Sequence, residues 1–241
     1  MKLIKLNAID STNEYVKKIK SSVNDKLFCV YTFNQTEGKG QRGNTWVTDP
    51  YKNLCASICY KPANPDTNYT SFKINMLVSI TLLDFFQALK VSNIKIKWPN
   101  DILSGNKKIA GILIETSIRS DKTNDYIIGI GLNINQEKFN QINNADSIKN
   151  INNMDYDLNE ITNRFLDLFE NFDLKFNRLS IDDVKNEYLK NLYGLNTNLN
   201  FLKNDDEFEA RIIDVVSDNK IKLLVNNKKI VFDSRDLKLV F

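Results

Sequence analysis

The sequence predicts an α+β protein with a large first domain and a small all-β second domain. Three observations predict this fold class. Several short segments are rich in β-forming apolar residues, and residues 94–98 alternate with a period of two, which is typical of strands, whereas residues 71–90 carry apolar side chains at helical spacing. After about residue 195 only short strand-like segments remain. A chain of 241 residues suffices for one large domain and a small partner, which we place at residues 1–194 and 195–241.

The first elements in chain order are a short strand at residues 2–6 and a helix. Ser11 is followed three residues later by Glu14, a capping-box spacing that predicts a helix from this point to about Ser21. A cap is the ordinary role for Ser11. A ligand-binding role is compatible with it, because polar groups at a helix start are well placed to contact a ligand.

A glycine-rich segment from Gln35 to Trp46 lies between strands predicted at residues 27–33 and 53–60. It reads Gln-Thr-Glu-Gly-Lys-Gly-Gln-Arg-Gly-Asn-Thr-Trp and holds three of the eight glycines of the chain. Closely spaced glycines let the backbone bend while N–H and cationic groups face outward, as a phosphate or carboxylate site requires. A basic surface turn has the same composition, so this segment alone leaves both interpretations open. We expect it to be a long loop between the two strands.

The central part of the chain predicts a long helix followed by a strand that ends in polar residues. The helix at residues 71–90 has an apolar face made of Ile74, Leu77, Val78, Leu82, Phe85 and Leu89. Residues 94–98 then alternate, which places Lys95 and Lys97 on the face opposite the two isoleucines. Taken alone, Lys97 has the ordinary interpretation of a solvated strand lysine.

Two longer strands are predicted at residues 107–117 and 126–135, after a hairpin turn at residues 104–106. Inside their apolar patterns stand three glycines, namely Gly111, Gly129 and Gly131. Glycine weakens a strand unless another backbone or a ligand must approach closely. These glycines therefore suggest a ligand that lies across the sheet.

The last third of the chain predicts a loop, covering helices and the all-β module. The Asn-rich residues 136–155 lack a clear period, and a helix opened by Asp157 and Glu160 and a second helix near residues 183–192 follow. The five strands expected after residue 195 are 197–202, 207–216, 220–225, 229–232 and 237–240. Their number and length match a small SH3-like barrel.

The composition excludes several classes of chemistry. The chain contains no histidine, which rules out Ser-His-Asp and Cys-His catalysis and the His-Glu-x-x-His zinc site. The 33 basic and 30 acidic residues are spread along the chain without a basic stripe, which argues against a general nucleic-acid binder. No apolar run reaches the length of a membrane span, and the first residues lack a signal peptide pattern.

The three cysteines are Cys29, Cys55 and Cys59. On one strand, Cys55 and Cys59 would lie about 13 Å apart, too far for a disulfide. We therefore expect reduced, half-buried thiols, as in a soluble cytoplasmic protein.

Five motifs occur in order along the chain. They are Asp-Ser-Thr-Asn at 10–13, Gly-Lys-Gly-Gln-Arg-Gly-Asn-Thr-Trp at 38–46, Lys-Trp-Pro-Asn-Asp at 97–101, Lys-Ile-Ala-Gly-Ile-Leu-Ile-Glu at 108–115 and Gly-Ile-Gly-Leu-Asn at 129–133. In this order and spacing they resemble the signature of the biotin protein ligases, over nearly the whole chain. The resemblance implies the catalytic fold of class II aminoacyl-tRNA synthetases and biotin ligases, a mixed β-sheet with helices, followed by an SH3-like β-barrel.

The resemblance implies a two-step ligase that uses biotin, ATP and Mg²⁺. Biotin and ATP would form biotinyl-5′-AMP, and a lysine of the biotin carboxyl carrier protein of acetyl-CoA carboxylase or a related carboxylase would accept the biotinyl group. It further implies a cytoplasmic monomer or homodimer without membrane association. Only ten residues precede Ser11, so we expect the monofunctional type without an N-terminal DNA-binding domain, and no sequence-specific DNA binding.

The resemblance also implies roles for individual residues. The rings of biotin would contact Ser11, Thr12, Asn13 and Gln35. The loop that closes over the biotin tail and the adenylate would supply Gly38, Lys39, Gly40, Gln41 and Arg42. The catalytic cations would be Lys97, Lys39 and Arg42, and Lys97 would also bind ligand oxygens. The remaining contacts would come from Trp46 as an apolar wall, from Gly111, Gly129 and Gly131 under the rings, and from Asn133 at the adenine or the metal. Residues 145–149 resemble the loop that covers the nucleotide, and no residue is assigned to hold Mg²⁺.

Two positions depart from the family pattern, which commonly has arginine where this chain has Lys39 and Gln41. Lys39 keeps the positive charge but lacks the bidentate geometry of arginine. Gln41 is uncharged, so either Arg42 compensates or biotinyl-AMP is held less tightly.

Two other functions fit part of the pattern. A lipoate protein ligase shares the catalytic fold and the acyl-adenylate route, but the motifs at 38–46 and 97–101 favour the biotin branch. A non-catalytic biotin sensor, whose C-terminal module binds a peptide or nucleic acid, is the alternative from a different class. The presence of Lys97 and Asn133 argues against it.

Overall fold

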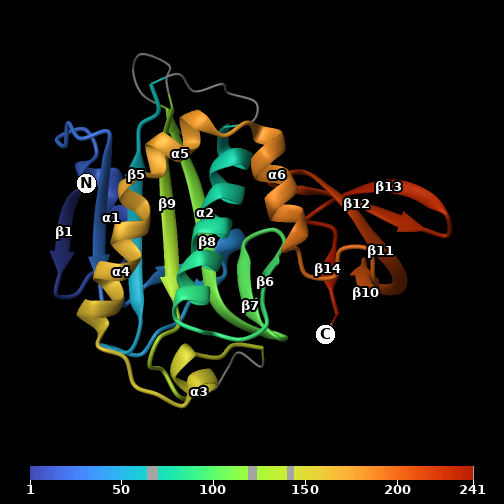
Figure 1. Ribbon diagram of the computed structural model, residues 1–241, viewed down its shortest axis with the longest axis horizontal. Coiled ribbons are helices and arrows are strands. Elements are labelled where there is room, and N and C mark those ends of the chain that lie inside the picture. The colour runs from blue at the N-terminus through green and yellow to red at the C-terminus, as the bar shows by residue number, and fades with distance from the viewer. Residues whose placement is uncertain (64–69, 119–123, 140–143, 241) are drawn as a thin grey trace.

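A seven-stranded β-sheet organises the larger part of the computed structural model, which describes residues 1–63, 70–118, 124–139 and 144–240 (Figure 1). Its strands in spatial order are β1 (Lys2–Leu6), β2 (Leu27–Thr32), β5 (Leu54–Tyr60), β9 (Asn124–Leu132), β8 (Lys107–Ile118), β7 (Asp101–Ser104) and β6 (Ile94–Lys97). Strands β1 and β2 pair in parallel, and the other neighbours pair antiparallel. The predicted mixed sheet is therefore confirmed.

Helices cover both faces of this sheet. Successive side chains of a strand point to opposite faces, so one strand can contribute to the apolar clusters on both sides. Phe28 and Val30 pack under α1 (Thr12–Ile19), whereas Cys29 between them belongs to the main core on the other side. Figure 1 shows the helices of that other side together. They are α2 (Thr70–Ala88), α4 (Leu158–Glu170), α5 (Phe172–Arg178) and α6 (Ile181–Lys190). The face under α1 is left partly open, and the candidate site lies there.

The structure corrects two sequence expectations in loops. The glycine-rich segment is a small hairpin, in which β3 (Gly38–Lys39) pairs with β4 (Thr45–Trp46) around a 3₁₀ turn at Gln41–Gly43. The segment 136–155, expected as a loop, contains α3 (Ile148–Asn152). This helix forms because Ser147 accepts a hydrogen bond from the backbone N–H of Asn150 at 3.3 Å and because Ile148 is buried. Residues 140–143 of that segment lie outside the described residues.

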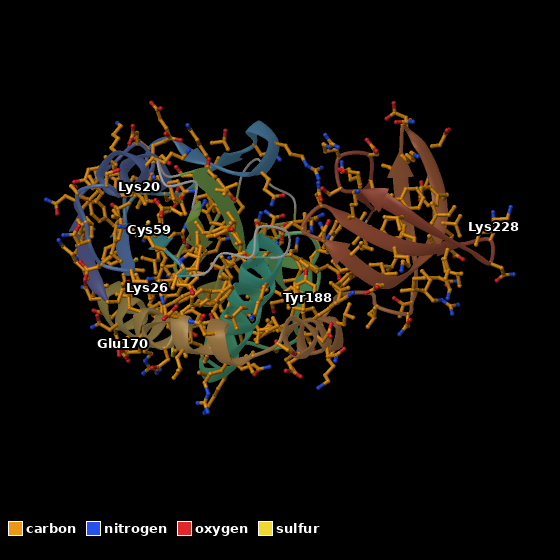
Figure 2. The ribbon with its side chains drawn as sticks, turned by 90° about the horizontal axis from the view of Figure 1, so that it is seen from above. Lys20, Lys26, Cys59, Glu170, Tyr188 and Lys228 are labelled. Carbon is orange, nitrogen blue, oxygen red and sulfur yellow. The ribbon has the colours of Figure 1, made fainter. Side chains whose placement is uncertain are left out.

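The predicted C-terminal strands form an antiparallel sheet. They are β10 (Asn198–Lys203), β11 (Asp206–Ser217), β12 (Lys220–Val225), β13 (Lys228–Asp233) and β14 (Lys238–Leu239), in the spatial order β13-β12-β11-β10-β14. Asn and Asp in left-handed backbone conformations make two of the turns, at residues 204–205 and 226–227. This C-terminal module projects beside the large domain, with Lys228 at its far end (Figure 2). The boundary at residue 195 stays a prediction, with α6 ending at Lys190 and β10 beginning at Asn198.

The three cysteines are free thiols, as expected, but they are fully buried rather than half-buried. Cys29 on β2 and Cys59 on β5 each pack in one of the two apolar clusters, and Cys55 on β5 is 3% exposed. Burial raises the pKa of Cys29 and of Cys55 to about 12, although Trp46 lowers that of Cys55 slightly. These two thiols are therefore protonated and unreactive. No helix among the described residues has the length and apolar character that a membrane span needs.

Candidate functional site

A cavity of about 380 Å³ opens on the face of the sheet that α1 covers. Its floor is built from small residues because Cys55 of β5 pairs with Gly131 of β9, and Gly131 pairs with Gly111 of β8. The walls come from α1, from the glycine-rich hairpin and from the C-terminal module. The volume is typical of a site for a small organic molecule.

Trp46 of the hairpin lies directly on this floor. A Cβ atom at Gly131 would overlap the indole ring, and a Cβ atom at Gly111 would lie 2.9 Å from its Cζ3. The ammonium group of Lys108 lies 5.4 Å from the centroid of the same ring. Two of the strand glycines therefore make room for a side chain of the protein, rather than for a ligand as the sequence suggested, and Trp46 forms an apolar wall of the cavity.

One end of the cavity is a network of uncharged polar groups. Gln35 Oε1 accepts hydrogen bonds from the backbone N–H of Thr12 at 2.9 Å and from its hydroxyl at 3.0 Å. The buried hydroxyl of Ser57 donates to Asn13 Oδ1 at 2.5 Å, and its oxygen lies 2.7 Å from Thr12 Oγ1. Ser11 caps α1 with a long contact of 3.5 Å to the N–H of Glu14. The four residues that the sequence analysis assigned to the biotin rings thus lie together, and Ser57, which it did not identify, contacts two of them.

The orientation of the Asn13 amide is fixed from both ends. Its nitrogen donates to Glu115 Oε2 at 2.8 Å, while its oxygen accepts from Ser57. A Cβ atom at Gly129 would lie 2.6 Å from that oxygen, so only glycine fits beside it. The amide is therefore held rigidly at the cavity wall, as a recognition group needs to be.

The glycine-rich hairpin is tied to α1 by an ion pair. Lys39 Nζ lies 2.9 Å from Glu14 Oε1, and Lys17 Nζ lies 2.8 Å from the same oxygen. Hydrogen bonds from Lys17 and Lys39 lower the pKa of the Glu14 carboxyl to about 2. The reciprocal half of the predicted capping box is absent among these contacts, because the Glu14 side chain binds these lysines instead.

Glu14→Gln should make the stability of the chain less sensitive to acid. A carboxyl whose pKa falls from 4.5 to about 2 on folding stabilises the fold above its ordinary pKa and loses this contribution as the pH falls toward the lower value. Between about pH 5 and about pH 3, the unfolding free energy of the unsubstituted chain should fall more than that of the variant, by up to about 1 kcal/mol. Urea unfolding at both pH values measures this difference. Glu207→Gln, at an exposed position, is the matched control, and an equal response of all three proteins would contradict the assignment.

The other end of the cavity is cationic. Lys97, at the end of β6, and Lys108, on β8, both line it, and Lys108 Nζ forms a 2.7 Å ion pair with Asp101. Burial lowers the pKa of the Lys97 ammonium, and Asp101 opposes this shift. The charges of Lys108 and Lys238 lower the pKa of Lys97 further. Several positive charges thus share one partly desolvated space, an arrangement that attracts an anion.

The C-terminal module closes this cationic end. It contributes lining residues that sequence reasoning did not identify, including Phe201, Ile212, Ser234, Leu237 and Lys238. Arg42, at the tip of the hairpin, is close enough to the module for its charge to add to the larger effect of Arg235 in lowering the pKa of Asp233. Arg42 itself has a left-handed backbone conformation with φ of 59°.

Most of the predicted site residues come together at this cavity. Those that line it are Ser11, Thr12, Asn13, Gln35, Lys39, Gly40, Gln41, Arg42, Trp46, Lys97, Gly111, Gly129 and Gly131. Gly38 instead lets β3 approach the backbone of Trp46. Asn133 is buried, and its amide donates to the backbone oxygens of Lys108 at 3.2 Å and Asp146 at 3.0 Å. It thereby holds the segment 145–149 against β8.

The described residues contain no group of three or more His, Cys, Asp and Glu side chains that could bind a metal ion on their own. Asp101 is the carboxylate that lines the cavity among them, and it is paired with Lys108. One carboxylate suits a Mg²⁺ ion that takes its other ligands from water and substrate phosphates.

Comparisons of the sequence with known proteins identify one family. The Biotin/lipoate A/B protein ligase family matches residues 6–133, more than half of the chain. The chain is similar to the bifunctional ligase/repressor BirA of Bacillus spizizenii, with 29% identity over 135 residues, 56% of this chain and 41% of that protein. It is also similar to a biotin–[acetyl-CoA-carboxylase] ligase of Paracoccus denitrificans, with 28% identity over 127 residues, 52% of this chain and 51% of that protein. The matched region thus spans about half or less of these curated relatives.

Solved structures show that the fold is shared over nearly the full chain. The biotin protein ligase from Aquifex aeolicus in complex with biotin and ATP superimposes with a TM-score of 0.80 at 21% identity, covering 99% of this chain and 98% of that one. The biotin protein ligase of Leishmania major in complex with biotinyl-5-AMP gives a TM-score of 0.65 at 22% identity, covering 96% and 98%. The predicted fold class, a mixed sheet with helices and a C-terminal β module, is confirmed.

Proposed function

We propose a function from one premise: the chain belongs to the Biotin/lipoate A/B protein ligase family. The proposed activity is that of an ATP-dependent biotin protein ligase, which forms biotinyl-5′-AMP and transfers the biotinyl group to a specific lysine of a biotin carboxyl carrier domain. The observation that supports it best is the cavity itself, in which a neutral hydrogen-bonding end and a cationic end lie on either side of an apolar wall.

The two ends of the cavity match the two halves of the first substrate. Biotin has a neutral ureido group, which hydroxyl and amide groups such as those of Thr12, Asn13 and Gln35 recognise. Its fused rings and tail are apolar and fit against Trp46. Its carboxylate then points toward Lys97 and Lys108, where the phosphates of ATP would also bind.

The first step needs charge neutralisation, because a carboxylate must approach a polyphosphate. Two unit charges about 4 Å apart repel by about 4 kcal/mol at an effective dielectric constant near 20. The ammonium groups of Lys97 and Lys108, with Lys39 and Arg42 on the hairpin, offset this repulsion and hold the reactants in line. Mg²⁺, held by substrate phosphates and the Asp101 carboxylate, would supply further neutralisation.

Both steps are substitutions that this site can support without histidine. In the first, a carboxylate oxygen of biotin bonds to the α-phosphorus, the bond to the bridging oxygen breaks, and pyrophosphate leaves with the electron pair. In the second, the amine of the carrier lysine bonds to the acyl carbon, AMP leaves with the electron pair, and the amine proton passes to water. The residues of this cavity contribute reactant orientation and charge stabilisation.

The partner that this proposal implies is a carrier domain of acetyl-CoA carboxylase or a related carboxylase. A cytoplasmic location, the absence of sequence-specific DNA binding and a monomeric or homodimeric state remain predictions from the sequence. Nanomolar affinity for an operator at physiological salt would contradict the prediction on DNA.

Thermal unfolding with biotin or lipoate tests the choice of substrate. A ligand present at about 100 times its Kd stabilises the fold by about 2.7 kcal/mol, so we expect biotin, and not lipoate at the same concentration, to raise the Tm. A larger shift with lipoate would favour the lipoate ligase alternative. Biotin binding without biotin-dependent release of pyrophosphate from ATP would favour the sensor.

Gln41→Arg should slow the escape of biotinyl-AMP. The side chain of Gln41 lines the cavity without a charge, and an arginine there would add a charged hydrogen bond of about 1.5–3 kcal/mol to the phosphate. We expect release of the intermediate to slow by about 10- to 100-fold, measured by filtration after a single turnover without carrier. Gln87→Arg, at an exposed position of α2, controls for the added charge. Equal release rates from the Gln41→Arg and unsubstituted proteins would remove the idea.

A further inference from the structure

The turn at residues 97–101, which carries two charged groups of the cavity, is held by contacts with β8, with α2 and with the C-terminal module. Asn100 exchanges hydrogen bonds with Ile112 of β8, donating from Nδ2 to its oxygen at 2.9 Å and accepting from its N–H at 2.9 Å. On the other side, Trp98 Nε1 donates to the backbone oxygen of Ser217 at 3.5 Å. Ser217 belongs to β11, so the turn also contacts the C-terminal module.

Asn75 of α2 joins this turn to the same part of the module. Its side chain is 7% exposed, and its Nδ2 donates both to the backbone oxygen of Pro99 at 3.1 Å and to Asp218 Oδ1 at 3.2 Å. Both protons of one amide are thus divided between the turn and the β11–β12 connection. A buried amide fixes position well, because breaking either bond leaves a polar group without water.

Asp218 lies at the boundary between the large domain and the C-terminal module. Burial raises the pKa of its carboxyl, although the Ser71 hydroxyl and the Asn75 amide favour the charged form. The charge of Asp218 in turn helps burial to raise the pKa of Tyr188 on α6. Tyr188 lies on the side of the large domain that faces the module (Figure 2). A carboxylate in such a place is held by specific hydrogen bonds rather than by solvent.

From these contacts we propose that Asn75 and Asp218 are positioning residues that couple the placement of the C-terminal module to the turn at residues 97–101. Residues of the module and of this turn both line the cavity, and Lys238 of the module is close enough to Lys97 for its charge to lower the pKa of that lysine. The coupling therefore sets the separation of Lys97 from Lys238 and acts on the nucleotide half of the reaction. The expected change in the KM for ATP rests on the proposed ligase function. The expected effect on the position of the turn does not.

The kinetic test compares two contacts between the large domain and the C-terminal module. Asp218→Ala should raise the KM for ATP in biotin-dependent pyrophosphate release by about fivefold or more, with the Kd for biotin within about twofold of the original value. Asp218→Asn keeps an acceptor for Asn75 and should restore most of the loss. Lys185→Ala removes the 2.8 Å ion pair with Asp214, which is not one of the contacts that hold the turn, and is the matched control. Equal KM changes in Asp218→Ala and Lys185→Ala would overturn the proposal.

A second measurement does not require any activity. The chain has two tryptophans, so a ¹⁵N-labelled sample gives two indole N–H signals, which Trp46→Phe assigns. Asp218→Ala and Asn75→Ala should each shift the Trp98 indole signal and speed its hydrogen exchange, while Lys185→Ala should leave it in place. An unchanged Trp98 signal in both variants would refute the coupling even if the chain proves inactive as a ligase, and inactivity of the unsubstituted chain would count against the proposed function alone.

Discussion

Lys108→Met should lower the rate of biotin-dependent pyrophosphate release by about 100- to 1000-fold, the usual effect of removing one group that stabilises charge developing in a transition state. Lys108 Nζ lies against Trp46 and pairs with Asp101 at the cationic end of the cavity. Methionine is one atom shorter than lysine and uncharged, so the apolar contact with Trp46 is largely retained. A stopped-flow assay with a coupled phosphate sensor measures the rate.

The neighbouring lysine provides the control for this prediction. Lys107 lies one residue earlier on the same strand and is exposed, so Lys107→Met should change the rate by less than about twofold. The melting temperature of Lys108→Met should stay near that of the unsubstituted protein. A rate for Lys108→Met within threefold of the original would contradict the role of this group.

Gly129→Ala should weaken biotin binding by about 10- to 100-fold, which corresponds to the loss of a buried hydrogen bond. The added methyl group would stand 2.6 Å from Asn13 Oδ1, so the amide must leave Ser57 and Glu115, which now fix it. Isothermal titration with biotin measures the effect. The substitution leaves the cationic end untouched.

A double-mutant cycle identifies the cause. Asn13→Ala removes the side chain that the new methyl group would displace, so adding Gly129→Ala to it should weaken binding by less than about twofold more. If the losses of biotin affinity caused by the two substitutions instead add in full, the methyl group does not act through Asn13, and the explanation fails.

The sequence predicted the elements whose signals are local. Ser11 starts a helix because its hydroxyl accepts from a nearby N–H, and the hairpin at residues 104–107 needs Gly105, which has φ of 57°. The strands around the cavity floor were predicted from their short, apolar and β-branched segments. The short helix α3 was missed, since five residues give no helical period and its stability comes from the cap at Ser147 and from the burial of Ile148.

The parts of the site that the sequence missed depend on contacts between distant segments. Lys108 was within a recognised motif, but only the pairing of β7 with β8 brings it to Asp101. Lys238 stands in a short strand without any distinctive pattern, and its place in the cavity follows from how the C-terminal module packs. The strand glycines were correctly seen as points of close approach, but the sequence could not show that Trp46 and Asn13 make that approach.

The central claim is that biotin and ATP react with each other in this cavity. The most direct measurement is a single turnover with the chain in excess over α-labelled ATP, with Mg²⁺ and biotin but no carrier domain, followed by chromatography of the bound nucleotide. We predict that nearly all of the label becomes biotinyl-AMP bound to the chain, with one pyrophosphate released per ATP, and that a carrier domain added later becomes labelled with biotin on one lysine. Cleavage of ATP at the same rate without biotin, or faster formation of an adenylate with lipoate, would contradict it.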